Sequence, residues 1–424
     1  MKLFKSLLLG SAAGLIAVSG ASAADLGVKK PAPVEYVKVC SAHGAGFFYI
    51  PGSDVCMQIS GRVRAEYQAA TTWTRADDAS SFRAHGRINV DTRQTTAFGL
   101  LRTYVRMEQY ADTGRYHGLA GAQGFTTEGS ILNKAFIQFY TGTAGFFTAG
   151  RAVSFFDAYA LDGPNWGRTI SSDRDNVNLF AYTFTFGGGL SASISVENNL
   201  QRNVTNAGSI TYAGQRMPDL VGNLRVDQAW GSAQLSGAVH QMNLMNRTPT
   251  GDYVDTAYGW AVQGGLKVNL PMIAAGDALW LQAAYSQGAL DYAGVSRYTN
   301  DALFGRVRGT INNADGYIDA LGNTKKASSW SVTAAFVHNF TPSIQMALFG
   351  AYGAVDYPSS SAWDYKAYNI GGRINWIPVR NFTIGTELTY NVIDPNGTGN
   401  AVAGVAAKGK YDSLNLRIRF QREF

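Results

Sequence analysis

The 424-residue sequence predicts an all-β fold, namely a closed, 16-stranded antiparallel transmembrane β-barrel. Three observations predict it. The C-terminal stretch alternates between apolar and polar residues, the same alternation recurs along the chain, and the connections between the alternating stretches are long and short in turn. Each of these is typical of a sheet with one face in lipid and the other in water.

The stretch from Tyr411 to Phe424 has the clearest alternation. One face carries Leu414, Leu416, Ile418, Phe420 and Phe424, and the other carries Asn415, Arg417, Arg419, Gln421 and Glu423. Only Arg422 departs from the apolar face. A period of two indicates a β-strand. An uncovered apolar strand at a chain end would aggregate, so we interpret it as the closing strand of a barrel, paired with the first strand.

Residues 1–23 have the composition of a signal peptide. Lys2 and Lys5 are basic, Leu7 to Val18 is uncharged, and Ala21-Ser22-Ala23 is a small-residue cleavage site. We therefore expect the mature chain to begin near Ala24 and to lie outside the cytoplasm. No later stretch approaches the roughly 18 to 20 apolar residues of a spanning helix, so insertion into a membrane would require a β-barrel.

Composition favours strands and turns over helices. The chain is 46% hydrophobic and 12% aromatic, with 48 glycines and only 16% charged residues. The formal net charge of +6 is modest, and the basic residues are scattered along the alternating strands. We therefore expect no nucleic-acid partner.

Residues 24–55 show no sustained period, and we interpret them as an extended periplasmic lead-in to the barrel at 56–424. Cys40 and Cys56 are the two cysteines of the chain. In an exported protein, an isolated pair is most simply a disulfide, which would anchor the lead-in beside the first strand. The alternative is two free thiols, which an oxidising compartment disfavours.

The alternation begins at Met57 and recurs to the chain end. The first half of the wall is expected at 57–68, 81–93, 99–110, 130–140, 144–151, 178–186, 189–197 and 218–228. The second half is expected at 231–242, 257–269, 277–288, 329–340, 343–354, 365–377, 381–392 and 411–424. The apolar face of each strand should meet lipid and the polar face water.

The connections provide an independent check on these strands. With the boundaries above, odd-numbered connections contain 10 to 40 residues and even-numbered ones 2 to 7. Transmembrane barrels have short periplasmic turns and long outer loops, so an even number of strands places both termini in the periplasm. Tight turns at Gly187-Gly188 and Thr341-Pro342 agree with this pattern.

Several stretches together resemble a known family: Cys40-Ser41, Gly44 to Gly52, Cys56, Ser60-Gly61-Arg62, Gly150-Arg151, Ser154-Phe155-Phe156-Asp157 and the terminal Phe424. They are similar to the alphaproteobacterial outer-membrane porins (general diffusion porins) over nearly the whole mature chain. The resemblance implies a homotrimeric, water-filled pore for passive diffusion of small hydrophilic solutes and ions, with one loop folded inward as a constriction. It also implies contact with outer-membrane lipid and a role for Phe424 in barrel assembly. Loops 198–217 and 289–328 follow no pattern, so nothing is carried over to them.

The third connection, about 152–177, is the expected constriction loop. Its acidic residues are Asp157, Asp162, Asp173 and Asp175. The first three strands place seven arginines on the polar face: Arg62, Arg64, Arg83, Arg87, Arg93, Arg102 and Arg106. A basic wall facing an acidic loop would set up a transverse field that favours polar, hydrated solutes. The alternative is a solvated loop with ordinary arginine–carboxylate pairs, but seven arginines would be costly on a dry face, which favours the pore.

Catalysis and cofactor binding have little support. The five histidines lack ligand spacing, and neither a nucleophile elbow nor a Ser/His/Asp order is present. Asn313 to Asp319 is similar to a calcium loop but lacks the distal Glu, and no Gly-rich phosphate loop opens a helix. We therefore expect no enzyme, metal or cofactor. Two other classes remain open: a solute-selective outer-membrane channel, and an outer-membrane adhesin or enzyme.

Overall fold

The structure is a computed structural model that describes residues 38–72, 78–114, 126–142, 144–158, 164–167, 169–205, 209–302, 313–358, 363–396 and 410–424. The chain divides into two compact units, Met1–Val39 and Cys40–Phe424, and the second contains all the strands given below. The expected signal peptide and the first part of the expected lead-in, 24–37, lie outside the described residues. Among the described helices, none is long and apolar enough to cross a membrane.

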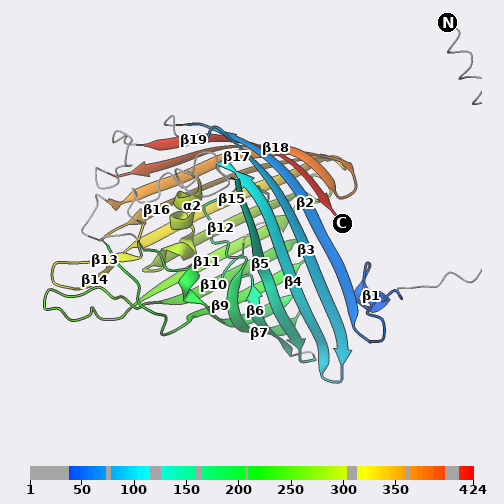
Figure 1. The fold of residues 1–424 in the computed structure, drawn as a ribbon, viewed down its shortest axis with the longest axis horizontal. Helices are drawn as coiled ribbons and strands as arrows, with labels where there is room; N and C mark the ends of the chain where they lie inside the picture. The colour runs from blue at the N-terminus through cyan, green and yellow to red at the C-terminus, as the bar shows by residue number, and fades with distance from the viewer. Residues whose placement is uncertain are drawn as a thin grey trace, which may run out of the picture. The chain divides into compact units, whose positions relative to one another are not determined.

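Sixteen strands form a closed wall (Figure 1). They are β2 (Cys56–Ala70), β3 (Ser80–Thr96), β4 (Gly99–Thr113), β5 (Thr126–Tyr140), β6 (Gly145–Ala152), β7 (Val177–Gly187), β8 (Leu190–Glu197), β9 (Asp219–Gln228), β10 (Gly231–Met242), β11 (Ala257–Asn269), β12 (Ala278–Gln287), β15 (Ser328–Thr341), β16 (Ile344–Asp356), β17 (Tyr365–Val379), β18 (Phe382–Pro395) and β19 (Tyr411–Glu423). Each wall strand pairs antiparallel with the next, and β19 closes the ring on β2 from Asn415↔Ala70 to Glu423↔Arg62. The predicted strand number and the closure by the C-terminal strand are therefore confirmed.

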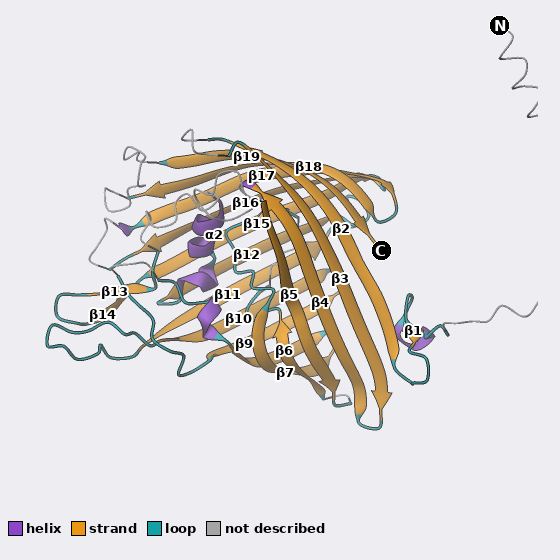
Figure 2. Ribbon diagram, viewed as in Figure 1, coloured by secondary structure: helices purple, strands orange, loops and turns teal. Residues whose placement is uncertain are grey.

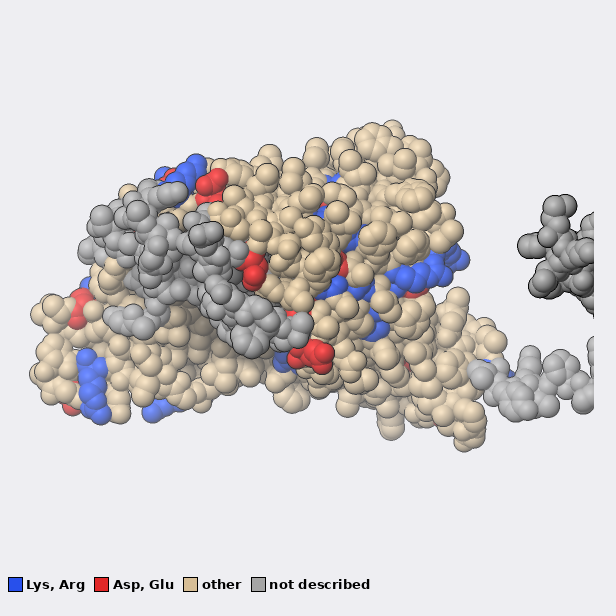
Figure 3. Space-filling view, turned by 45° about the horizontal axis from the view of Figure 1, so that its top comes forward, with Lys and Arg blue, Asp and Glu red and all other residues tan. Residues whose placement is uncertain are grey.

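The two faces of the wall differ in the way that the alternation predicts. On β19, Leu414 and Phe420 are 48% and 47% exposed on the outside, whereas Asn415 and Arg419 are 8% and 5% exposed on the inside. In the space-filling view, most of the visible surface belongs to uncharged residues, and the charged ones gather in a few places (Figure 3). An apolar outside and a polar inside suit a barrel that lies in lipid.

The connections alternate in length, so the barrel has two different ends. The short turns are 97–98, 141–144, 188–189, 229–230, 270–277, 342–343 and 380–381, and we call their end the short-turn end. The long connections are 71–79, 114–125, 153–176, 198–218, 243–256, 288–327, 357–364 and 396–410, at the long-loop end. The C-terminus lies at the short-turn end (Figure 1).

The long connections pack together through buried apolar side chains. The ordered pieces of these connections are η3 (Asn199–Gln201), η4 (Leu290–Ala293), α2 (Val295–Ala302), β13 (Gly316–Ile318) and β14 (Thr324–Lys326). Ile170, Val204, Leu290 and Tyr298 come from three different connections and share one buried cluster. The Tyr298 hydroxyl donates to Asn391 on β18 at 2.8 Å, so α2 packs against the inner wall (Figure 2).

The residues before the barrel are fastened to the first wall strand. After η1 (Ser41–His43), the short β1 (Phe48–Tyr49) pairs with β2. Cys40 and Cys56 form a disulfide, and both are buried. The predicted disulfide is therefore present, and it joins this segment to the first residue of β2.

Candidate pore constriction

The connection 153–176, which we call the inward loop, folds into the barrel. At its root, Asn223 on β9 and Gln263 on β11 donate their side-chain amides to the carbonyls of Phe155 and Phe156, at 2.6 and 2.8 Å. Further along, the hydroxyl of Thr333 on β15 donates to the Ile170 carbonyl. These wall residues come from different strands but share the inner face. The inward fold of this connection is as predicted.

The tip of the inward loop is fixed by Glu387 on β18. This carboxylate is 2% exposed and accepts the backbone N–H groups of Trp166 and Gly167, at 2.5 and 2.9 Å. A carboxylate that accepts two N–H donors makes charge-assisted hydrogen bonds, which are stronger than neutral ones. On the neighbouring β19, Arg417 donates to the Trp166 carbonyl at 2.7 Å. Glu387 therefore holds the tip against the β18–β19 wall.

The Trp166 ring packs against two guanidinium groups. Arg419 lies 4.3 Å and Arg373 5.5 Å from the ring centroid, within cation–π range. Gly385 on β18 leaves room for the ring, because a Cβ there would lie 2.6 Å from Trp166 Cη2. The tip thus presents its indole to a cluster of arginines.

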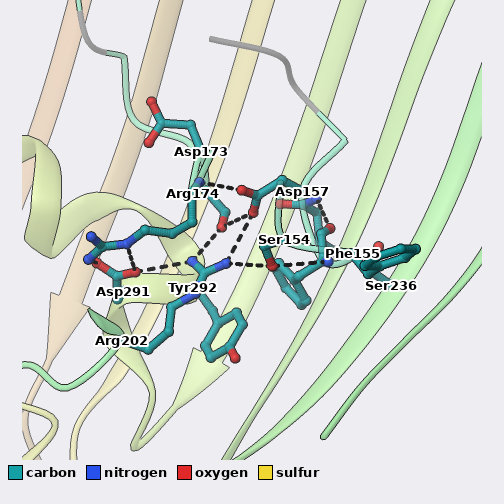
Figure 4. Close-up of polar contacts among 12 residues, drawn as sticks. Ser154, Phe155, Asp157, Asp173, Arg174, Arg202, Ser236, Asp291 and Tyr292 are labelled. Carbon is teal, nitrogen blue, oxygen red and sulfur yellow. Dashed lines mark hydrogen bonds and ion pairs between the residues drawn. The ribbon is translucent and has the colours of Figure 1, made fainter. Parts of the chain in front are cut away.

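A buried cluster of charged residues holds the rest of the inward loop (Figure 4). Its centre is Arg202, 1% exposed, from connection 198–218. Arg202 donates to the hydroxyls of Ser154 and Ser172 at 2.9 and 2.8 Å, and to the carboxylates of Asp157 and Asp291 at 3.3 and 3.0 Å. One guanidinium therefore ties together both halves of the inward loop and connection 288–327.

Burial and close ion pairs together determine the pKa values in this cluster. Burial alone would raise the pKa of Asp291, but Arg174 and Arg202 outweigh it and hold that pKa below its usual range. Arg174 makes a two-pronged contact to Asp291, at 2.8 and 2.5 Å. Burial would lower the pKa of Arg202, but Asp157, Tyr292 and Asp291 outweigh it and raise that pKa. Asp291 and Arg202 therefore both keep their charges in the folded protein.

The three described acidic residues of the expected constriction have partners in loops and wall. The Asp157 side chain is 3% exposed and accepts from Ser172, the Arg174 backbone and Arg202. Asp173 accepts from Arg297 at 2.9 Å. Asp175 accepts from Asn133 at 3.1 Å. Asp162 lies outside the described residues.

The expected basic residues separate into two groups. Arg62, Arg64, Arg87 and Arg106 line a cavity of about 500 Å³ at the loop tip, which we call the arginine cavity. Arg83 pairs with Asp112, while Arg93 and Arg102 share Asp91. The second group, together with Arg87 of the first group, which pairs with Glu108, therefore makes the arginine–carboxylate pairs that the alternative interpretation describes.

The arginine cavity is more basic than the three strands alone would make it. Arg373 and Arg419 also line it, together with Asn165 and Trp166 of the loop tip, and the one acidic residue among its lining is Glu423. Sequence reasoning placed Arg419 on the polar face of its strand but not in the site, and it missed Arg373, Glu387 and Arg202. Arg373 and Glu387 could have been found as charged residues on the inner face of an alternating strand. Arg202 lies in a connection without a period and had no such signal.

Metal binding is not favoured by the described residues. Cys40, His43 and Cys56 lie close enough to share an ion, but both sulfurs are committed to the disulfide. In the stretch similar to a calcium loop, Asp315 is 0% exposed. It accepts from the backbone of Leu290 and Val204 and from the Tyr212 hydroxyl, at 2.6, 2.8 and 2.7 Å. Its role there is to pack the long connections together.

Comparison with known proteins agrees with this architecture. The sequence profile of the Porin subfamily matches residues 25–416. Porin Omp2b of Brucella melitensis is 30% identical over 371 residues, covering 85% of this chain and 96% of that protein.

Two solved structures share the fold at low identity. The outer membrane channel DcaP of Acinetobacter baumannii is 15% identical, with a TM-score of 0.65 over 89% of this chain and 99% of that chain. The trimer form of OmpT from Vibrio cholerae is 10% identical, with a TM-score of 0.51 over 88% of this chain and 100% of that chain. With the profile matched across most of its length and its wall closed by sixteen strands, the chain belongs to the porin family and is an outer-membrane diffusion channel.

Proposed function

We propose that this porin passes small hydrophilic solutes and ions by passive diffusion and favours anions at its narrowest section. The observation that carries the proposal is the arginine cavity, where six arginines and one glutamate surround the anchored tip of the inward loop. A confined aqueous passage with low-dielectric walls, lined mainly by one sign of charge, raises the local concentration of ions of the opposite sign. The inner wall around it is polar, which suits hydrated solutes.

Arg106 is the arginine best suited to test this preference. It donates to neutral groups, the Asn89 side-chain carbonyl at 2.9 Å and the Tyr104 hydroxyl at 3.0 Å. Among the described residues no carboxylate forms an ion pair with it, in contrast to Arg87, which contacts Glu108 at 2.5 Å. Its charge should therefore act on passing ions.

Replacing Arg106 with glutamine should lower the anion-to-cation permeability ratio by up to about sevenfold, because a unit charge ~7 Å away in water stabilises an anion and destabilises a cation by roughly 0.6 kcal/mol each. The measurement is the reversal potential of single channels in a KCl gradient at low ionic strength, where screening is weak. Arg106→Lys keeps the charge and should keep the ratio. An unchanged reversal potential in Arg106→Gln would contradict the anion preference.

We further propose that the channel is a homotrimer. The similar OmpT structure is described as a trimer form, and cyclic symmetry is a frequent solution for self-association. On β3 and β5, the outward positions Ala84, Gly86 and Ala135 are small, which would let two walls approach closely. Chemical cross-linking in mild detergent should give a trimer band, and monomers alone would contradict the proposal.

Export and assembly would use the two ends of the chain. Residues 1–23 would direct export and be removed, and the mass of the folded protein isolated from membranes checks that the mature chain begins near Ala24.

At the other end, the Phe424 and Gly61 backbones exchange hydrogen bonds of 2.9 and 3.1 Å. A Cβ at Gly61 would lie 2.3 Å from the Arg87 carbonyl oxygen on β3 and 2.7 Å from the Phe424 ring, so both neighbours fit where Gly61 has no side chain. The Gly61–Phe424 pair would complete the seam between β19 and β2.

Deleting Phe424, or replacing Gly61 with valine, should therefore lower the yield of folded barrel in the membrane by severalfold while leaving the conductance of the barrels that form nearly unchanged. The yield is measured as the fraction of protein that resists denaturation by unheated detergent. Gly264→Ala on β11 is the matched control, because nothing lies within 4 Å of a Cβ built there. A normal yield with altered conductance would count against a role in assembly.

A further inference from the structure

A second cavity, of about 750 Å³, lies on the inner wall formed by β4 to β9 and at the root of the inward loop. Its lining includes four aromatic side chains, Tyr104, Phe136, Phe146 and Phe155, and we call it the aromatic cavity. The volume falls within the range of about 300 to 1,000 Å³ that is usual for small-molecule sites. It shares none of its lining residues with the arginine cavity.

The aromatic wall is unusual for its place in the fold. The interior of a transmembrane barrel is ordinarily polar, because it faces water. Here Tyr104 and Phe136 are register partners on β4 and β5, and their rings stack at 5.3 Å with an interplanar angle of 21°. Phe146 stacks in the same way on Tyr140, at 4.7 Å. Covering a water-exposed apolar ring face with a flat apolar group lowers the free energy of the system.

The charge that borders these rings is positive. The Arg102 guanidinium lies 5.3 Å and 5.6 Å from the ring centroids of Tyr104 and Phe136. Its side chain is 23% exposed, whereas that of its partner Asp91 is 8% exposed and does not line the cavity. Lys134 also lines the cavity. A guanidinium therefore lies over both rings, and a second cationic side chain lines the same cavity.

The acidic side chains that line the aromatic cavity do not make its charge negative. The Asp157 side chain is 3% exposed and is paired with Arg202. Asp227 forms a two-pronged ion pair with Arg225, with both distances 2.7 Å. Around them lie neutral hydrogen-bonding side chains, among which Thr183 and Ser193 contact each other at 3.0 Å. The cavity thus offers apolar ring faces, cationic side chains and neutral polar groups.

We propose that the aromatic cavity binds small aromatic carboxylates as they pass through the pore. The aryl ring stacks on Tyr104, Phe136 and Phe146, and the carboxylate is held beside Arg102. This deepens the proposed function and rests on it, since an anion must first be admitted. It makes the channel selective for one class of solute within the anions that it passes.

The test uses benzoate as the probe, with acetate as a solute of equal charge without a ring and benzamide as one with a ring and no charge. Chloride current through single channels is recorded at constant ionic strength while each solute is added. Benzoate should reduce the current along a saturating curve. Acetate should change it only in proportion to its concentration, and benzamide should need a concentration at least severalfold higher than benzoate.

Variants of the aromatic residues then show whether the benzoate block arises in the aromatic cavity. Phe136→Gln and Phe146→Gln place polar side chains on a polar inner face, and each should raise the half-blocking concentration of benzoate by roughly three- to tenfold, as expected for one aromatic contact. Tyr140→Phe is the matched control, because Tyr140 stacks on Phe146 without lining the cavity, so the change keeps the ring and should keep the block. Chloride conductance and reversal potential should stay unchanged in all three, which also shows that the barrels are intact. If one glutamine variant does not fold, the other still provides the test.

The outcomes separate this proposal from the broader one. If benzoate acts like acetate while the channel still prefers anions, the aromatic site is wrong and the anion preference stands. Equal block by benzamide, or benzoate block that survives both glutamine variants, would overturn it as well. Saturating block that depends on Phe136 in a channel without anion preference would support the site and overturn the proposed selectivity.

Discussion

Replacing Glu387 with alanine is expected to free the tip of the inward loop and widen the channel. The carboxylate accepts the N–H groups of both Trp166 and Gly167, and it is 2% exposed. Hydrogen bonds to a charged group contribute roughly 1.5 to 3 kcal/mol each, so losing both shifts the attachment of the tip by about 3 kcal/mol, or roughly a hundredfold. Single-channel conductance should rise, and larger neutral polymers should enter.

The same substitution also removes a negative charge near the arginine cavity, so its two effects need separating. Glu423→Ala is the control, because Glu423 lines the arginine cavity and is exposed, and its side chain accepts from Gln421 and not from the described part of the inward loop. It should shift the reversal potential toward anions with little change in polymer exclusion. A Glu387→Ala channel that excludes the same polymers as Glu423→Ala would show that the tip is held by other contacts.

The wall could be predicted from sequence because lipid on one side and water on the other impose a period of two on every strand. β11 begins and ends where the alternation predicts, at 257 and 269. The prediction for β5 began four residues late, at 130, whereas the strand begins at Thr126. The cause is that residues 126–130 contain no apolar side chain, so the alternation is not visible there. Further along β5 the register with β4 breaks between Arg106 and Met107, and Asn133 is the extra residue: it donates to Asp175, and the next residue, Lys134, also faces inward and lines a cavity on the inner wall.

The partners within the site could not be predicted in the same way. Trp166 and Glu387 are 221 residues apart, and Arg174 and Asp291 are 117 apart. Each residue follows a local rule, a turn or a polar strand position, but no local rule couples them. Asp157 illustrates the consequence. Its place in the inward loop was foreseen, whereas its enclosure by Ser172 and Arg202 depends on a connection with no period.

The short helix α2 was missed for a related reason. It has eight residues, from Val295 to Ala302, which is too short for a periodic signal to stand out. Gly294 immediately before it has a φ of 76°, a conformation that suits glycine and turns the chain from η4 into α2. Its packing against the inner wall, through Tyr298, comes from tertiary contacts.

Replacing Arg202 with methionine is expected to cause the largest loss of stability in the protein. Methionine removes the cation that contacts Asp157 and Asp291, and each of those carboxylates has a side chain 3% exposed. Removing one partner of a buried ion pair costs about 3 to 5 kcal/mol when the remaining charge is left without compensation, as Asp157 would be here, whereas Asp291 keeps its pair with Arg174. Lysine keeps the charge but cannot make four separate contacts with the geometry of a guanidinium, so Arg202→Lys should fall in between.

The loss should first appear in the inward loop, because the wall keeps its own ladder of backbone hydrogen bonds. Amide hydrogen exchange at the Arg174 N–H, which donates to Asp157, should become faster, and the single-channel current should become noisier before the barrel melts. Arg225→Met is the matched control: its ion pair with Asp227 is 37% and 54% exposed, and such a pair is worth about 0 to 1 kcal/mol. If Arg202→Met melts, exchanges and conducts like Arg225→Met, then Arg202 does not hold the inward loop, and the loop must be fixed by Glu387 and the amides of β9 to β11 alone.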